Sequence, residues 1–127
     1  MPELGESIGV IVVDHGSRRA EANGMLECVA AAFRAQSGVG IVEHAHMELA
    51  PPTIGDAFDA CVARGARHVV VCLYFLSPGR HSREDIPALA AEAAARHPGV
   101  GFSVTQPLGV DARIADVMAE RVREALV

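Results

Sequence analysis

The chain has 127 residues, a formal net charge of −5, and hydrophobic side chains at 50% of its positions. These values predict one folded domain over residues 1–127, with an ordered core from about residue 8, and argue against extensive disorder. All 11 positive side chains are arginines, and an acidic chain without a basic field is a poor candidate for binding nucleic acid. No apolar run approaches the roughly 18 residues that cross a bilayer. The N-terminal MPELGES lacks a secretory pattern, so we expect a cytoplasmic protein, or a plastid protein if a transit peptide was removed.

Three cysteines, Cys28, Cys61 and Cys72, lie far apart in the chain. Two fall on the apolar side of helix-like patterns and one lies inside a strand-like run, so we expect reduced residues of the core. The sequence has no CxxC pair and therefore predicts neither a zinc knuckle nor an iron–sulfur motif.

Strand-like and helix-like segments alternate along the chain. Strands are expected at residues 8–13, 41–47, 69–76 and 100–105, and helices at 18–36, 53–65, 85–96 and from 111 onward. This alternation predicts an α/β fold, with a four-stranded parallel sheet and helices on both of its faces.

Capping and periodicity add detail to the expected helices. Thr53 and Asp56 resemble a capping box, and Pro87 must lie in the first turn of its helix. The first helix is expected to turn one apolar face to the core, formed by Met25, Leu26, Val29, Ala30 and Phe33. Asp111 is expected to cap the last helix, which should likewise face inward with Ile114, Val117, Met118, Val122 and Leu126.

Ionisable residues gather where the expected strands end. His15 follows the first strand, Glu48 the second and His81 the third. The carboxyl ends of parallel strands meet at one edge of the sheet, where open α/β proteins bind ligands, so these side chains are expected to share a site. Two imidazoles suit a transition metal but do not close a tetrahedral structural zinc site, so they favour transient metal holding or proton transfer. Glu48 could complete such a site or accept protons, and a solvated carboxylate is the equal alternative.

Arginines and serines surround the same edge. Arg18, Arg80 and Arg83, together with Arg19, suit a carboxylate-rich ligand, because guanidinium pairs well with carboxylate; ordinary solvated arginines are the alternative. Asp14, His15 and Ser17 are the residue types of a hydrolase triad. Neighbours along the chain rarely adopt that geometry, so a serine hydrolase is disfavoured.

The remaining histidines carry weaker signals. Alternation places His44 and His46 on one face of the sheet, with His46 nearer the ligand-binding edge. His68 and His97 fall at the opposite edge and are expected to be solvated. None of the four is assigned a direct role.

Four motifs together resemble a known family. They are HGSR after the first strand, HMELAPPT after the second, FLSPGRHSREDIP after the third and PLG after the fourth. In this order they are similar to the short class II sirohydrochlorin chelatases of siroheme and cobalamin synthesis, the CbiX/SirB type. The match runs from about Ile8 to the end of the chain, and the fuller wording VVDHGSRR is similar to plastid-type ferrochelatases.

The resemblance implies a chelatase-like fold related to flavodoxin and a lyase that inserts a divalent metal into sirohydrochlorin. The family's metal-binding histidines fall on His15 and His81, which would also assist deprotonation of the pyrroles, and Glu48 is the further catalytic candidate. Ser17, Arg18, Arg80, Ser82 and Arg83 are the expected substrate-binding residues. The metal is a substrate, with Fe²⁺ favoured over Co²⁺ or Ni²⁺, and no permanently bound cofactor is expected.

Family members also differ in length and assembly. Long members contain two such halves, so a chain with one half is expected to form a homodimer. Plastid-type members carry a cysteine-bearing extension for an iron–sulfur cluster, and these 127 residues contain none. The alternatives are cobalt or nickel insertion into the same pigment, and a non-catalytic carrier of metal or tetrapyrrole.

Overall fold

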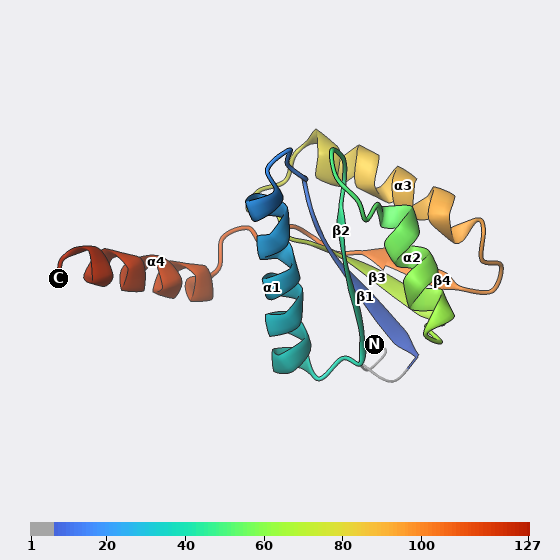
Figure 1. Ribbon diagram of the computed structural model, residues 1–127, viewed down its shortest axis with the longest axis horizontal. Coiled ribbons are helices and arrows are strands. Elements are labelled where there is room, and N and C mark those ends of the chain that lie inside the picture. The colour runs from blue at the N-terminus through green and yellow to red at the C-terminus, as the bar shows by residue number, and fades with distance from the viewer. Residues whose placement is uncertain (1–6) are drawn as a thin grey trace.

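The computed structural model describes residues 7–127, apart from the side chains of His81 and Ser82. Its elements, in chain order, are β1 (Ile8–Asp14), α1 (Ala20–Ser37), β2 (Ile41–His46), α2 (Ile54–Ala63), β3 (His68–Leu73), η1 (His81–Asp85), α3 (Ile86–Ala94), β4 (Gly101–Val104) and α4 (Ala112–Ala125). The strands form one parallel sheet in the order β2-β1-β3-β4. One face carries α1 and the other carries α2 and α3 (Figure 1). The predicted α/β fold is confirmed.

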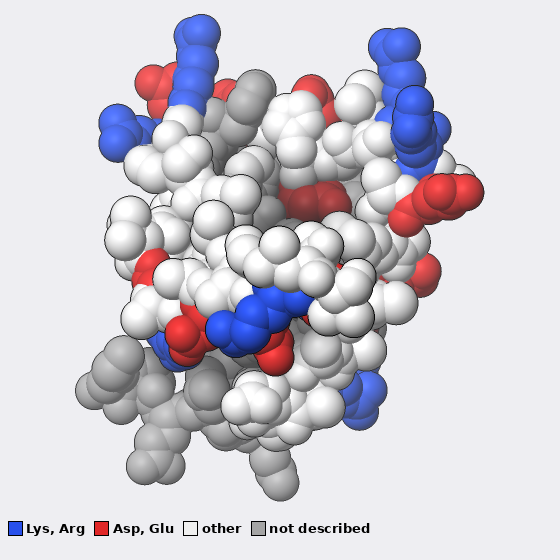
Figure 2. Space-filling view, turned by 90° about the vertical axis from the view of Figure 1, so that its left-hand side faces the viewer, with Lys and Arg blue, Asp and Glu red and all other residues white. Residues whose placement is uncertain are grey.

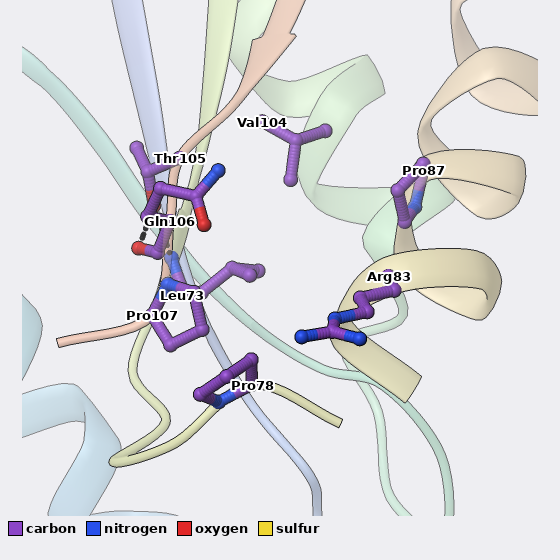
Figure 3. A pocket seen from close by; sticks show the side chains of 8 residues that line it. All are labelled: Leu73, Pro78, Arg83, Pro87, Val104, Thr105, Gln106 and Pro107. Carbon is purple, nitrogen blue, oxygen red and sulfur yellow. Dashed lines mark hydrogen bonds between the residues drawn. The ribbon is translucent and has the colours of Figure 1, made fainter. Parts of the chain in front are cut away.

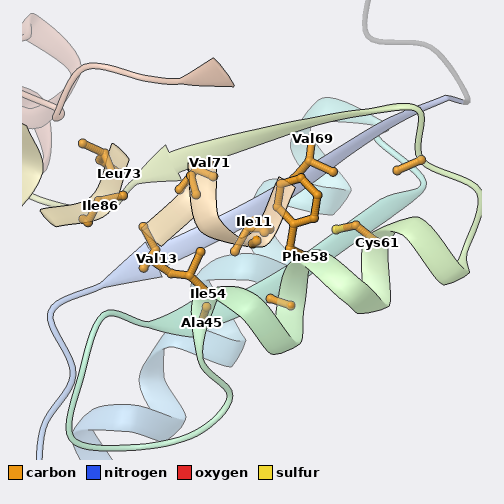
Figure 4. Packing of buried hydrophobic residues seen from close by; sticks show 14 of the residues in the cluster. Ile11, Val13, Ala45, Ile54, Phe58, Cys61, Val69, Val71, Leu73 and Ile86 are labelled. Carbon is orange, nitrogen blue, oxygen red and sulfur yellow. The ribbon is translucent and has the colours of Figure 1, made fainter. Parts of the chain in front are cut away.

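The core has two parts because side chains of each strand alternate between the two faces of the sheet. The larger part lies under α2 and α3 and includes Ile11, Val13, Phe58, Val71 and Ile86 (Figure 4). The smaller part lies under α1 and includes Ile8, Val10, Val12, Leu26 and Ala30. Strand β1 is buried on both faces, as expected for a central strand of a parallel sheet.

Local sequence signals set several helix ends. The Thr53 Oγ1 accepts a hydrogen bond from Asp56 N at 3.0 Å, and Asp56 Oδ2 accepts one from Thr53 N at 3.1 Å. This confirms the capping box at the start of α2. Gly38 follows α1 with φ of 75°, and its N–H donates to Arg34 O at 3.0 Å. Pro87 lies in the first turn of α3, as predicted.

Three predictions about apolar residues are wrong: the end of the third strand, the burial of Met25, and the place of Cys28 in the core, since Cys28 is exposed on α1. Strand β3 ends at Leu73, before the predicted end at residue 76, and Tyr74 and Leu76 are exposed. Tyr74 N still donates to Val13 O. Strand β1 ends there, and the loop after it hydrogen-bonds to the chain after β2. The residues that follow Tyr74 therefore have no neighbouring strand to pair with. Met25 is 58% exposed because α1 turns Leu26 and Ala30 toward the sheet instead.

The edge of the sheet opposite the expected site is less solvated than predicted. His97 stacks on Phe58 at 5.8 Å, and its Nε2 lies 2.6 Å from Asp59 Oδ1. Arg96 Nη2 donates to the same oxygen at 2.9 Å. These two hydrogen bonds, that from His97 first, lower the pKa of Asp59 below its ordinary value of 3.8. His68 is half-buried and hydrogen-bonds Ser103 at 2.7 Å.

The last helix departs most from expectation. Asp111 caps α4 as predicted, since its side chain accepts a hydrogen bond from Arg113 N at 2.9 Å. However, within the described residues none of α4 is buried. Figure 1 shows α4 extending away from the sheet. The prediction that its apolar side chains pack on the sheet of this chain is therefore wrong.

Candidate metal and substrate site

Backbone hydrogen bonds join the loops that follow β1 and β2. Met47 N donates to Asp14 O at 2.9 Å, and Glu48 N donates to His15 O at 3.1 Å. These bonds continue the parallel pairing of the two strands past the end of β2. His46 N turns instead to Pro52 O at 2.9 Å. The two loops are thereby held together, and the residues they carry lie side by side.

His15 and Glu48 meet at this edge. The His15 Nε2 lies 3.3 Å from Glu48 Oε1, and the two side chains are 45% and 50% exposed. An imidazole and a carboxylate at this separation can share one metal ion or pass a proton between them. Among residues 7–127, the described side chains contain no group of three or more His, Cys, Asp or Glu that could hold a metal.

A glycine allows the close approach of these loops. Gly16 has a φ of 94°, which side chains rarely adopt, and a Cβ placed there would lie 1.9 Å from Glu48 O. Only glycine provides both the conformation and the space. The G in the HGSR motif is thus required by the contact between the loop of His15 and the loop of Glu48.

Directly beside this pair lies a second, partly buried pair, Asp14 and His46, that sequence reasoning missed. His46 is 2% exposed, and its Nδ1–H donates to Asp14 Oδ1 at 2.6 Å. The two residues are register partners on β1 and β2. In the sequence, the one sign of this pair is that Asp14 and His46 each stand at the end of a strand. That position does not reveal which two strands are neighbours in the sheet. Asp14 precedes His15, so the pair braces the backbone that carries the exposed imidazole.

Asp14, His15 and Ser17 do not form the hydrogen-bonded triad that a serine hydrolase needs. Asp14 is engaged by His46, and the Ser17 Oγ accepts a hydrogen bond from Arg19 N at 3.0 Å. Ser17 N donates to Asn23 Oδ1, whose Nδ2 donates back to Ser17 O, at 3.0 and 2.7 Å. Two of the three residue types of a triad are thus held by other partners.

A cavity of about 330 Å³ lies between the carboxyl ends of β3 and β4 and the start of α3. Arg83 points into it from η1, opposite Pro78, Gln106 and Pro107 (Figure 3). A second cavity, of about 340 Å³, is lined by Glu48 together with residues of η1 and α3. Both volumes lie at the lower end of the range for small-molecule pockets.

The other predicted substrate-binding arginines are exposed. Arg80 Nε lies 3.4 Å from Glu84 Oε2, and Arg18 is exposed in the loop after β1. The face drawn in Figure 2 has positive side chains, all of them arginine, at both upper corners and also lower down, and acidic atoms in a recess between the upper corners. The side chains of His81 and Ser82 lie outside the described residues, so their predicted roles stay predictions.

Comparison with known proteins identifies the family of this chain. The CbiX family model matches residues 9–125. The chain belongs to the CbiX family. It is 49% identical over 123 residues to the chloroplastic sirohydrochlorin ferrochelatase of Arabidopsis thaliana, covering 97% of this chain and 55% of that protein. It is 31% identical to the sirohydrochlorin cobaltochelatase of Sulfurisphaera tokodaii, with 93% of each covered.

A solved structure gives the same picture of the fold. SirB from Bacillus subtilis with Fe³⁺ superimposes with a TM-score of 0.87 and 30% identity, covering 95% of this chain and 48% of that one. The chain thus spans about half the length of the A. thaliana ferrochelatase and of B. subtilis SirB, and nearly the full length of the S. tokodaii cobaltochelatase. Within the described residues, no helix is long and apolar enough to cross a membrane.

Proposed function

We propose that this chain is a sirohydrochlorin chelatase that inserts a divalent metal, with Fe²⁺ favoured, into the tetrapyrrole. One observation carries the proposal: the His15–Glu48 pair stands at the ligand-binding edge of a chain that aligns over 97% of its length with a ferrochelatase at 49% identity. The A. thaliana relative, named a sirohydrochlorin ferrochelatase, supports iron; the S. tokodaii relative, named a cobaltochelatase, keeps cobalt as the alternative metal.

The pair can perform the two tasks that insertion requires. Neutral His15 holds the arriving cation, and protonation of the ring releases it because a charged imidazole is no ligand. As the metal enters, two pyrrole protons must leave, and the Glu48 carboxylate at 3.3 Å from the imidazole is placed to accept one. His81 is the proposed second metal ligand and assists deprotonation.

The carboxylate arms of the pigment are bound by arginine and serine side chains around the pair. Arg83 can pair with a carboxylate arm that enters the cavity of Figure 3, and Arg18 and Arg80 can bind arms at the surface. The Ser17 hydroxyl accepts from Arg19 N and keeps its own O–H to donate to a carboxylate. Ser82 is assigned the same role from its place in the motif.

The proposed partners follow from these roles. The metal is a substrate, no cofactor stays bound, and the protein acts as a homodimer without nucleic acid or membrane. The compartment, cytoplasmic or plastid, stays a prediction; the relative from A. thaliana is named chloroplastic. A carrier that binds pigment without inserting metal is the alternative from another functional class.

The test is anaerobic insertion of Fe²⁺, Co²⁺ and Ni²⁺ into sirohydrochlorin, followed by absorption against a protein-free control. Replacing a general base costs about 10²–10⁴-fold in rate, so Glu48→Gln and His15→Ala should each lower insertion by that order. Glu27→Gln is the matched control, because Glu27 also lies near an imidazole, 3.8 Å from His44, but on α1 away from the site. Pigment binding without accelerated insertion of any metal would replace the enzyme with the carrier.

A further inference from the structure

Leu49 has a backbone conformation that leucine rarely adopts. Its φ is 73°, and among the described residues it is the one residue other than glycine with a positive φ. A left-handed backbone costs a leucine free energy, because its Cβ crowds the following carbonyl oxygen. Two hydrogen bonds fix the loop that carries it: Glu48 N donates to His15 O, and His46 N donates to Pro52 O. The conformation is therefore imposed by the same loop contacts that form the candidate site.

The strain at Leu49 does not serve the packing of the core. The side chain is 55% exposed, and Leu49 belongs to neither part of the core. Strained backbone that the surrounding structure maintains is typical of ligand sites, where it positions a side chain for a partner. Leu49 directly follows Glu48 in the chain, so it stands at the candidate site. The strain therefore points to a contact with a bound molecule.

Two further leucines are exposed at the same edge of the sheet. Leu76 follows β3 and is 71% exposed, and Leu108 follows β4 and is 41% exposed. Two backbone hydrogen bonds, of 2.8 and 2.9 Å, join their loops. In the strand order β2-β1-β3-β4, the loop of Leu49 lies on one side of His15 and the other two loops lie on the other side. Neighbouring strands are about 4.8 Å apart, so the row of loops spans roughly 14 Å, on the scale of a large ring system.

The cavity of Figure 3 continues this apolar row. Pro78, two residues after Leu76, and Pro107, directly before Leu108, both line it. Arg83 points into the same cavity from η1. The edge thus combines apolar side chains with guanidinium groups, a combination that suits a flat apolar ring system with carboxylate arms.

We propose that Leu49, Leu76 and Leu108 form a seat for the ring system of the tetrapyrrole, and that the strained backbone of Leu49 holds its side chain in place for that contact. The inference rests on the proposed function, because it takes sirohydrochlorin as the occupant. It goes further by assigning the ring system to leucines, whereas the predicted substrate-binding residues are arginines and serines. The occupant is the pigment because the leucine seat borders the His15–Glu48 pair and the nearby arginines match carboxylates.

Titration with metal-free sirohydrochlorin, followed by absorption, tests the leucine seat. Loss of the apolar contact of one leucine weakens binding about tenfold, so we expect this change in Leu49→Ala and in Leu76→Ala. Leu49→Met conserves the volume and should bind like the wild type. Met25→Ala is the matched control, because Met25 is 58% exposed but lies on α1. Wild-type affinity in either leucine variant would overturn the proposal.

Ionic strength separates the leucine seat from the arginines. Salt weakens the pairing of arginine with carboxylate by screening, whereas apolar contact has no charge to screen. The loss of affinity in Leu49→Ala should therefore be equal at low and high salt, while the loss in Arg83→Gln should shrink at high salt. A loss in Leu49→Ala that shrinks in the same way would show that the substitution acts through the charged groups, and would overturn the proposal.

Two small residues at position 49 test the strain. Glycine adopts a positive φ readily and alanine does not. Leu49→Gly should therefore unfold at a higher urea concentration than Leu49→Ala, the reverse of the order expected where φ is negative. Both variants lack the leucine side chain, so both should lose pigment affinity. If Leu49→Gly is the less stable of the two, or binds pigment like the wild type, the strained backbone does not serve binding.

Two further measurements separate the leucine seat from other roles. Sedimentation of Leu49→Ala should match that of the wild type, and a changed oligomeric state would assign Leu49 to a contact between copies of the chain and overturn the seat. Metal insertion is assayed apart from binding. A wild type that binds pigment with loss in the leucine variants, yet inserts no metal, would remove the chelatase and keep the seat. An active wild type whose leucine variants bind normally would do the reverse.

Discussion

Replacing Gly16 with alanine should disrupt the candidate site by a calculable displacement. The new Cβ would lie 1.9 Å from the Glu48 carbonyl oxygen, where real contacts begin at 3.0 Å, so the two loops must separate by about 1.1 Å. That movement breaks the hydrogen bond from Glu48 N to His15 O. Left-handed strain of about 1–2 kcal/mol and a lost hydrogen bond of about 1 kcal/mol together predict a free energy of unfolding lower by about 2–3 kcal/mol.

The effect on rate should exceed the effect on stability. A misplacement of about 1 Å between reacting groups costs roughly 10²-fold, so we expect Gly16→Ala to insert metal about a hundred times more slowly while still folded. The assays are urea unfolding and anaerobic insertion into sirohydrochlorin. Gly38→Ala is the matched control, since Gly38 also has a positive φ of 75° but no atom within 4 Å of the added Cβ. Equal insertion rates for the two variants would refute the reasoning.

Three further predictions concern the core, the opposite edge and the thiols. Phe58→Ala removes a ring that is 0% exposed, so urea unfolding should show a loss of about 3–5 kcal/mol; a loss below about 1 kcal/mol would contradict the packing of Figure 4. Hydrogen bonds from His97 and Arg96 lower the pKa of Asp59 in the folded protein below its ordinary value of 3.8. The stability that the Asp59 carboxylate adds is therefore complete above about pH 3.8, the pKa of the unfolded chain, and is lost as the pH falls through the lower pKa of the folded protein. The difference in unfolding free energy between wild type and Asp59→Asn should accordingly shrink below about pH 4, and a difference that stays constant with pH would count against it. Burial raises the pKa of the Cys61 thiol to about 12, so at pH 8 mass spectrometry should find alkylation of exposed Cys28 first and of Cys61 only after unfolding; early labelling of Cys61 would disprove its burial.

The layout of the fold could be predicted because its signals are local. Apolar runs such as residues 8–13 and the capping box of Thr53 depend on neighbours within a few positions. Alternation of strand and helix then imposes a parallel sheet, and a parallel sheet brings His15 and Glu48 to one edge. The structure places their side chains 3.3 Å apart.

The residues that support the site could not be predicted in the same way. Asp14 and His46 are 32 positions apart, and they meet because β1 and β2 are neighbours in a register that pairs these two residues. A local sequence pattern predicts neither the order of the strands in the sheet nor the register between them. The contact of His97 is likewise set by the packing of distant segments. Beside Pro98 and Gly99 the residue was expected to be solvated, but its ring stacks on Phe58 of α2.

Helix α4 shows why a correct local prediction can still give a wrong contact. Its cap at Asp111 and its apolar period were both identified from the sequence, and both are present. Periodicity states that a helix has an apolar face, but it does not state which surface that face covers. The loop that ends at Asp111 directs α4 away from the sheet of its own chain (Figure 1), and none of the described residues of α4 is buried. Connection geometry therefore belongs beside periodicity when helices are assigned to surfaces.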